Sequence, residues 1–220
     1  MRSRTAALVY VTALCATLYG CSNSVQQNGS ITGVATGAAS DGAVPTAGPS
    51  ASLAPVAGLS MSFRIPSDLT LEFQTADQGS ATANQIQTIL AYQYEGFIEA
   101  LSSSEATESN YKSLTVGDAL AAENTELDWW KQQKERLTGV DRLYAFTVKV
   151  SSAHAAVYSF CEDSTALEYL NLTDDQTVEN TAGTTRNYTL RKGVLVKDKG
   201  ELWAVQTLIT QDGAASCIGK

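Results

Sequence analysis

The sequence predicts an α+β fold in which the helices precede a run of antiparallel strands. Apolar residues recur at helical spacing over two segments, and from about Leu143 onward they alternate with polar residues. Elements grouped in this way favour helices packed on one face of a curved antiparallel sheet. The first sixty residues lack the apolar content of a core, so we expect a single folded domain over residues 61–220.

The first elements of the domain are a short strand and two helices. Leu69–Phe73 alternates apolar and polar residues, which predicts a strand. Three- and four-residue spacing predicts one amphipathic helix from Thr82 to about Leu101 and a second from Val116 to Leu137, with a loop or short helix between them. Gly96, inside the first helix, costs about 1 kcal/mol relative to Ala, so we expect a close packing contact there.

The alternating segment begins with two strands joined by a turn. Tyr144, Phe146, Val148 and Val150 are expected on one face of the first strand, and His154–Cys161 is expected to run back beside it. The residues that follow, up to Arg186, are mostly polar. They predict a long excursion with one helical turn near residues 166–170.

The last hairpin is the clearest strand signal. It joins a strand over Asn187–Val196 to one over Glu201–Thr210, with a turn containing Gly200 between them. Trp203, Val205 and Ile209 are expected to share one face of the last strand. Gly193 is expected to mark a bulge.

The N-terminus has the three parts of a secretory signal. Arg2 and Arg4 supply positive charge, Ala6–Leu18 is apolar, and small residues precede Cys21. Leu18-Tyr19-Gly20-Cys21 resembles a bacterial lipobox, in which the signal (residues 1–20) is removed and the cysteine is acylated. We therefore expect lipidation at Cys21 and anchoring to the outer face of the cell membrane. Ordinary secretion and a retained membrane anchor are the alternatives.

Residues 21–60 are expected to form a linker. After Cys21 this segment consists almost entirely of small and polar residues, with Asp41 as its only charged residue. Such a composition buries too little apolar surface to offset the entropy of ordering, so we expect a disordered tether between the anchor and the domain.

Two cysteines remain for the folded domain, because Cys15 lies in the signal and Cys21 in the lipobox. In an oxidising compartment Cys161 and Cys217 are expected to form a disulfide. A metal site and a redox pair are the alternatives. Two cysteines and one histidine give a metal site little support, and a redox pair normally has Cys-x-x-Cys spacing.

The charge and the absent motifs exclude several functions. With 15 basic and 23 acidic residues the chain should be repelled by nucleic acid, so no nucleic-acid partner is expected. No hydrolase, phosphate-loop or zincin motif occurs, and we expect no cofactor. His154 is the only histidine, and an exposed structural role is expected for it. Two acidic pairs, Glu162-Asp163 and Asp174-Asp175, could bind calcium, but a solvated acidic loop is the favoured interpretation.

Three segments of the domain carry a resemblance to a known group. Val140–Tyr144, Tyr158–Asp163 and Gly213–Cys217, together with the lipobox and the tether, resemble secreted lipoproteins of actinobacteria. These are similar in outline to the cone-shaped α+β fold of nuclear transport factor two and of ketosteroid isomerase-like proteins. The resemblance covers roughly residues 66–217. It implies a pocket inside the cone, and the fold by itself implies no activity.

Two functions follow as hypotheses. The first is a non-catalytic lipoprotein whose domain binds a small apolar ligand or a cell-envelope protein. The second is an isomerase- or cyclase-type enzyme that uses the cone, for which an inward Asp would be needed; none is placed there, because the acidic residues are assigned to loops and turns. Five aromatic residues could line the pocket, although core packing is the commoner role: Tyr94, Trp130, Tyr144, Phe146 and Tyr158. Because Trp129 and Trp130 are adjacent, only one of them is expected to reach the core.

Overall fold

Helices and strands are grouped along the chain as the sequence predicts. The computed structural model describes residues 56, 59, 61–102, 109–179, 185–197 and 202–219. The predicted signal and Cys21 lie outside these residues. In chain order the elements are β1 (Leu69–Phe73), α1 (Ala81–Ser102), α2 (Ser109–Leu114), α3 (Gly117–Gln133), β2 (Glu135–Ser152), β3 (Ala155–Asn171), β4 (Thr177–Glu179), β5 (Tyr188–Lys197), β6 (Trp203–Asp212) and the 3₁₀ helix η1 (Ala215–Cys217).

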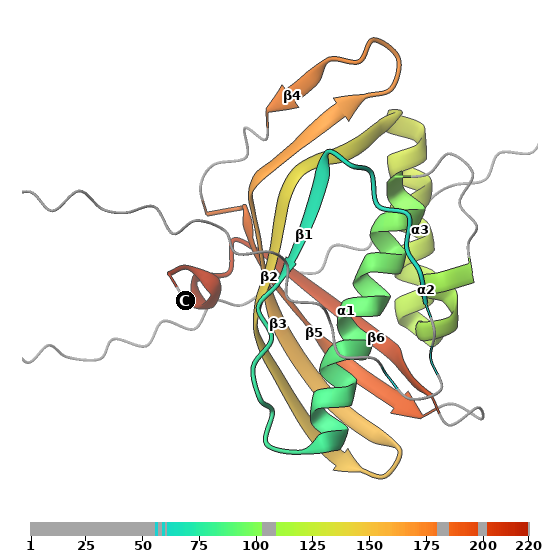
Figure 1. The fold of residues 1–220 in the computed structure, drawn as a ribbon, viewed down its shortest axis with the longest axis vertical. Helices are drawn as coiled ribbons and strands as arrows, with labels where there is room; N and C mark the ends of the chain where they lie inside the picture. Colours follow the sequence, from blue (N-terminus) through green and yellow to red (C-terminus); the bar gives the residue numbers. More distant parts are fainter. Residues whose placement is uncertain are drawn as a thin grey trace, which may run out of the picture. The chain divides into compact units, whose positions relative to one another are not determined.

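Within the described residues, six strands form one curved sheet that does not close on itself. Its order is β1-β2-β3-β5-β6, and β4 pairs with β3 outside this path. The β1–β2 pair is parallel, and the other pairs are antiparallel. The helices cover one face of the sheet (Figure 1). The predicted α+β class is therefore confirmed.

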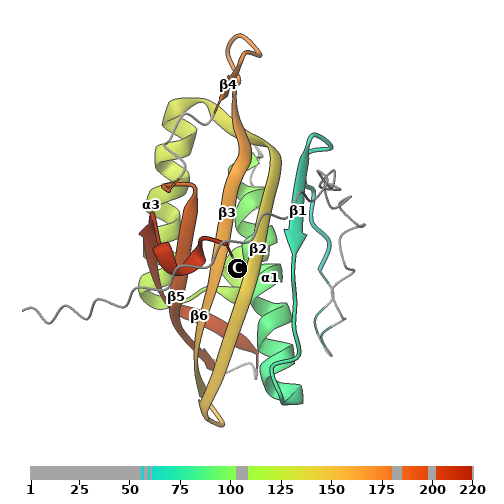
Figure 2. The same ribbon diagram turned by 90° about the vertical axis from the view of Figure 1, so that its left-hand side faces the viewer.

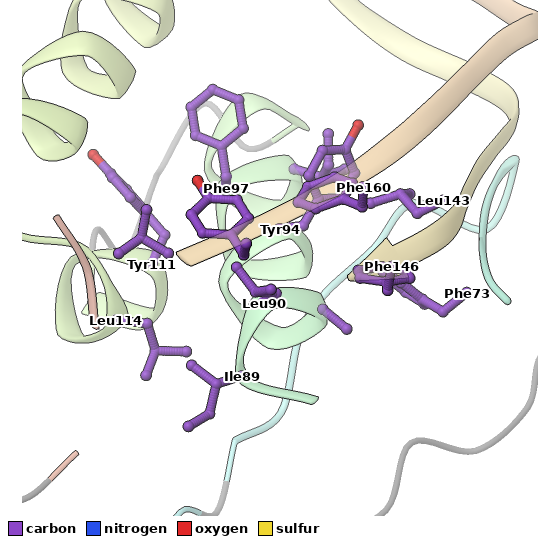
Figure 3. Packing of buried hydrophobic residues seen from close by; sticks show 14 of the residues in the cluster. Phe73, Ile89, Leu90, Tyr94, Phe97, Tyr111, Leu114, Leu143, Phe146 and Phe160 are labelled. Carbon is purple, nitrogen blue, oxygen red and sulfur yellow. The ribbon is translucent and has the colours of Figure 1, made fainter. Parts of the chain in front are cut away.

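The core lies between α1 and the inner face of the sheet, which is the face that the helices cover. Ile86, Ile89 and Leu90 of α1 are buried in one hydrophobic cluster with Leu143 and Phe160 of the sheet. Figure 3 shows part of this cluster, with Leu90, Leu143 and Phe160 among the labelled residues. Val56 and Leu59, which the sequence places at the end of the linker, also pack on this core. No helix among the described residues is long and apolar enough to cross a membrane.

Gly96 is the point where α1 approaches α2 most closely. A Cβ atom at this position would lie 2.8 Å from the backbone nitrogen of Tyr111, inside van der Waals contact. The Tyr111 ring in turn packs edge-on against Phe97, with ring centroids 6.0 Å apart. The packing contact predicted for Gly96 is confirmed.

The second predicted helix ends earlier than expected. α3 stops at Gln133, Lys134 takes the left-handed conformation with a φ of 55°, and Leu137 already belongs to β2. Leu137 pairs there with Tyr169 of β3. Its spacing from Trp130 fits a helix, but the pairing with β3 decides its conformation. The prediction for the two tryptophans is confirmed: Trp129 is 52% exposed, and Trp130 packs against the core.

The polar segment after Cys161 is mostly strand, so the excursion with a helical turn is wrong. β3 continues to Asn171, and Ala166–Leu170 pairs with the start of β2. Gly139 makes this pairing close, because a Cβ atom there would lie 2.2 Å from the carbonyl oxygen of Ala166. The five residues 166–170 are too few to distinguish helical spacing from strand alternation. Pairing with β2 gives them the extended conformation.

A bulge in β2 reverses the predicted facing of Tyr144. Ala145 has a φ of 52°, and the register with β3 shifts between Tyr144 and Thr147. The extra residue places Tyr144 on the outer face of the sheet, opposite the helices, whereas Phe146 and Val148 point into the core. The expectation that Tyr144 and Phe146 share a face is therefore wrong.

The last hairpin is confirmed, but a bulge alters the facing of β6. The register of β5 with β6 shifts between Val194 and Leu195, one residue after the predicted position at Gly193. As a result Leu208 packs on the core with Trp203 and Val205, and Ile209 is 56% exposed. The predicted common face of Trp203 and Ile209 is wrong because the bulge changes the alternation between them.

Candidate functional site

Four polar side chains from four elements meet inside the core. Tyr94 comes from α1, Asp141 from β2, Glu162 from β3 and Arg191 from β5. The three strand residues lie on the inner face because they alternate in step with buried apolar neighbours such as Leu143. Asp141 is fully buried, and Tyr94, Glu162 and Arg191 are nearly so. We call these four residues the interior cluster.

Each member of the interior cluster contacts another member. The hydroxyl of Tyr94 donates a hydrogen bond to Oδ2 of Asp141. Nε of Arg191 donates to Oε2 of Glu162 at 2.5 Å, and the guanidinium carbon lies 5.2 Å from the centroid of the Tyr94 ring. Oδ1 of Asp141 is buried without a hydrogen-bond partner in the described part of the chain. One acceptor position of this carboxyl group is therefore unused.

Burial controls the protonation of the cluster. Burial first, and then the negative charge of Glu162, raise the pKa of Asp141 well above its ordinary value, which favours its neutral form. Burial opposes the charge of Arg191, but the carboxylate of Glu162 holds the pKa of this guanidinium well above its ordinary value. The cluster thus combines a Glu162–Arg191 ion pair with the hydrogen-bonded Tyr94 and Asp141, whose pKa values are both raised.

A second buried acid lies between α1 and α3. Glu123 is 2% exposed, and its Oε1 accepts a hydrogen bond of 2.5 Å from Nε2 of Gln93, which also donates to Thr115. Oε2 of Glu123 has no hydrogen-bond partner among the described residues. Burial raises the pKa of Glu123 to about 7, so this group changes charge near neutral pH.

The outer face of the sheet carries the disulfide and a small cleft. Cys161 of β3 is bonded to Cys217 of η1, with their Cα atoms 5.5 Å apart, which confirms the predicted pairing. The bond holds the C-terminal segment against the face opposite the helices (Figure 2). The hydroxyl of Tyr144 donates to the carbonyl oxygen of Cys217. Beside this contact lies a cleft of about 180 Å³ lined by Gln74, Arg142, Tyr144, Asp163, Tyr188 and Gly219.

The cleft is polar and internally paired. Nε of Arg142 binds Glu72 at 2.9 Å, and its Nη1 lies 3.4 Å from Oδ2 of Asp163. Oδ1 of Asp163 accepts hydrogen bonds from the backbone and hydroxyl of Thr165. The guanidinium of Arg142 is thus paired with Asp163 in the lining and with Glu72, which is not a lining residue, so the cleft does not favour an anionic ligand.

The five predicted pocket residues separate into two groups. Tyr94, Phe146 and Tyr158 belong to the core, and their rings pack around Phe160 with centroid distances of 6.4, 5.0 and 6.1 Å respectively. Trp130 packs at the edge of the same core. Tyr144 lies on the other face, so it cannot line a space between sheet and helices. For the other four, a pocket remains a prediction.

The other candidate residues do not converge on one site. His154 is exposed beside the turn between β2 and β3. Glu162 and Asp163 are strand neighbours on opposite faces, each bound to an arginine, and the other acidic pair, Asp174-Asp175, is exposed after β3. The acids at 162 and 163 are thus wrongly assigned to a loop. In the described ranges, no three His, Cys, Asp or Glu residues are grouped so that they could hold a metal ion.

Sequence reasoning missed the buried Asp141. The residue follows the segment that was assigned to a helix up to Leu137, so its place in a strand was not recognised. Once β2 is extended back to Glu135, Leu137, Gly139, Asp141 and Leu143 fall on one face by alternation. A charge on an otherwise apolar strand face is the signal that could have identified it.

Comparisons with known proteins give little further information. No protein-family model matches the chain, and no curated protein matches it. One solved structure, the intermembrane space region of the chloroplast protein ARC6, is 9% identical with a TM-score of 0.42, over 59% of this chain and 96% of that chain. A second, named as a ketosteroid isomerase from Shewanella frigidimarina NCIMB 400, is 7% identical with a TM-score of 0.32, over 57% and 93%. At these scores neither match bears on function.

Proposed function

We propose that the protein is an exported lipoprotein, anchored to the outer face of the cell membrane through an acylated Cys21, whose domain is a binding module. The observation that supports export is the Cys161–Cys217 bond. Both cysteines are almost fully buried, and disulfides of this kind persist in oxidising compartments. The lipobox-like tetrad before Cys21 supports the anchor. We also infer that the domain belongs to the cone-shaped group of nuclear transport factor two, as in actinobacterial lipoproteins of this type, because helices pack on a curved sheet.

The interior cluster supports binding in preference to catalysis. A general base must be ionised and within reach of a substrate proton. Burial raises the pKa of Asp141 well above its ordinary value and so disfavours its ionised form, and Glu162 is bound by Arg191. The charged groups Glu162 and Arg191 of the interior thus bind each other. The ligand of the binding module is a small apolar molecule or a cell-envelope protein.

Metabolic labelling tests the anchor. Cells that express the full chain are grown with an alkyne-tagged palmitate, and the membrane and soluble fractions are separated. The wild-type protein is expected to carry the label in the membrane fraction, and the Cys21→Ser variant is expected to lose it. Cys15→Ser, in the predicted signal, is the matched control and should keep the label. A Cys21→Ser protein that is still labelled would overturn the anchor.

A second function, an isomerase-type enzyme, is favoured by one observation. The carboxyl of Asp141 and the hydroxyl of Tyr94 are hydrogen-bonded to each other inside the domain, and Oδ1 of Asp141 has no partner among the residues that the structure describes. Because the Tyr94 hydroxyl proton is donated to Oδ2, a protonated Oδ1 of Asp141 is the group that can donate a hydrogen bond to an oxygen that gains charge during proton transfer beside a carbonyl, and Tyr94 orients this carboxyl group.

Substituted phenols test this second function, because a bound phenolate imitates the charged oxygen of an enolate. Ultraviolet difference spectra are recorded for the wild type and for Asp141→Asn, with Glu123→Gln as the control for removing another buried acid. The enzyme hypothesis expects phenolate binding in the wild type and in the control, and a loss of at least tenfold in Asp141→Asn. Absence of phenol binding in the wild type would eliminate it.

A further inference from the structure

Exposed apolar side chains occur near the end of α3, just after β3 and in β4. Trp129 and Trp130 lie near the C-terminal end of α3, with ring centroids 5.2 Å apart. The ring centroid of Trp130 lies 5.4 Å from that of Tyr169 in β3. Val178 of β4 is paired with Tyr169, so the two side chains are neighbours on one face. The backbone N–H of Leu172 donates to the carbonyl oxygen of Lys134, one residue beyond α3. We call these five apolar residues the aromatic end.

The aromatic end is unusually open to solvent. Trp129 is 52% exposed, Leu172 51% and Val178 49%. A tryptophan offers a large apolar area for contact. When a protein partner buries it, the tryptophan contributes more binding free energy than most other residues do. β4 and the junction of α3 with β2 lie at the same end of the domain (Figure 1). Ring contacts and strand pairing connect Trp129, Trp130, Tyr169 and Val178, and the backbone hydrogen bond of Leu172 to Lys134 brings that residue next to the end of α3. Exposed apolar residues in such a group are typical of interaction sites.

The charges around the aromatic end restrict its partner. Apart from Glu126, which is largely buried near Arg191 and Glu162, residues 126–136 and 168–178 contain five acidic and three basic residues. One of the three bases, Arg136, is bound to Asp68 in a two-pronged ion pair, with distances of 2.8 and 2.7 Å. The segment 168–178 itself has three acidic residues and no basic residue. The surface around the apolar residues is therefore net acidic.

Two occupants are disfavoured by this charge. A second copy of the chain carries a formal charge of −8 and would meet its own acidic surface. Anionic lipid headgroups would likewise be repelled by the carboxylates near the tryptophans. A partner that carries both positive and apolar side chains is favoured, because its cations attract the carboxylates and its apolar side chains cover Trp129 and Val178.

We propose that the aromatic end is a docking site for a basic segment of another protein, in which lysine or arginine residues flank apolar ones. This proposal rests on the binding function proposed above and names the partner class and the surface. The apolar contacts supply most of the affinity, and the acidic surroundings select the sign of the partner and speed its association. The interior cluster and the cleft beside the disulfide take no part in this binding.

Selection from a random library of twelve-residue displayed peptides tests the proposal. The full chain is expressed with its N-terminal signal exchanged for a cleavable one and Cys21 replaced by Ser, so that it is soluble and oxidised. Peptides are enriched on this protein, synthesised, and titrated against it at low and high salt. Enriched peptides are expected to carry an excess of lysine and arginine and to bind more weakly as the salt concentration rises.

Two substitutions of exposed apolar residues decide where the peptides bind. Trp129→Ala is expected to weaken binding at least tenfold, and Ile209→Ala, on the outer face of β6, is expected to leave it unchanged. Both side chains are more than half exposed, so neither substitution should unfold the domain. The melting temperature of each variant checks this. Asp174→Asn with Asp175→Asn should weaken binding less and reduce its salt dependence.

Each of the other outcomes overturns the proposal. Peptides without a basic excess contradict the partner class. Basic peptides that bind Trp129→Ala as tightly as the wild type contradict the surface, although the function as a binding module then survives. If the library yields no binder, the docking site is overturned by that result alone. The membrane anchor is tested separately by labelling of Cys21.

Discussion

The Cys161–Cys217 bond should provide a large part of the stability of the domain. It closes a loop between residues 56 positions apart, which includes the second half of β3, β4, β5 and β6. In the chain-entropy model a loop of this length restricts the unfolded chain by about 4 kcal/mol. Replacing both cysteines with alanine is therefore expected to lower the free energy of unfolding by about that amount.

Urea unfolding at pH 7, followed by tryptophan fluorescence, measures this loss. With a denaturant dependence of about 2 kcal/mol per molar urea, a loss of 4 kcal/mol moves the midpoint by about 2 M. Cys161→Ala and Cys217→Ala break the same bond singly, so each should match the double variant to within about 1 kcal/mol. The reduced wild-type protein should behave likewise.

A small effect would refute this reasoning. If all variants lose less than about 1 kcal/mol, the bond does not limit the unfolded ensemble as the loop length requires. The bond would then act only locally, by holding η1 against Leu190 and Tyr144 on the outer face. Hydrogen exchange distinguishes the two cases, since a local role predicts loss of protection in residues 213–219 alone.

Three further predictions concern the interior. The pKa of Glu123 is raised to about 7 in the folded state, so its stabilising contribution is complete below its unfolded value and is lost as the pH rises through 7. Unfolding free energy should fall by up to about 3 kcal/mol between pH 5 and pH 9, and Glu123→Gln should reduce this slope. Arg191→Met should cost about 3–5 kcal/mol by leaving Glu162 buried and unpaired. Gly96→Ala should cost about 1–3 kcal/mol, because its Cβ atom meets the backbone of Tyr111.

Each of these predictions has its own control. For the pH dependence, a slope unchanged in Glu123→Gln would assign it to other acids, with Glu95, whose pKa burial also raises to about 7, the next candidate. For Arg191, adding Glu162→Gln to Arg191→Met should restore most of the loss, and a double variant as unstable as the single one would contradict the pairing. For Gly96, Thr82→Ala at an exposed position of the same helix should leave the free energy of unfolding unchanged or raise it. Equal changes in the free energy of unfolding at both sites would show that α2 moves to accommodate the Cβ atom.

Part of the candidate site could be predicted from the sequence, and part could not. The pairing of Cys161 with Cys217 followed from counting the cysteines that remain after the signal. The partition of Trp129 and Trp130 followed from their adjacency on a helix. Asp141 was missed because the end of the preceding helix was placed four residues too late, and a strand face is recognised only when the strand is placed correctly. The aromatic end also depends on β4 and the extension of β3, which local composition assigned to an excursion.

Local patterns were sufficient for β1, α1 and the last hairpin. In each of them the alternation or the helical spacing continues over enough residues to distinguish a helix from a strand without knowledge of its neighbours. Tertiary structure decided the rest. The bulge at Ala145 turned Tyr144 to the outer face, and the bulge beside Leu195 exchanged the roles of Leu208 and Ile209. A single inserted residue reverses every side chain beyond it, and only the partner strand determines where that insertion falls.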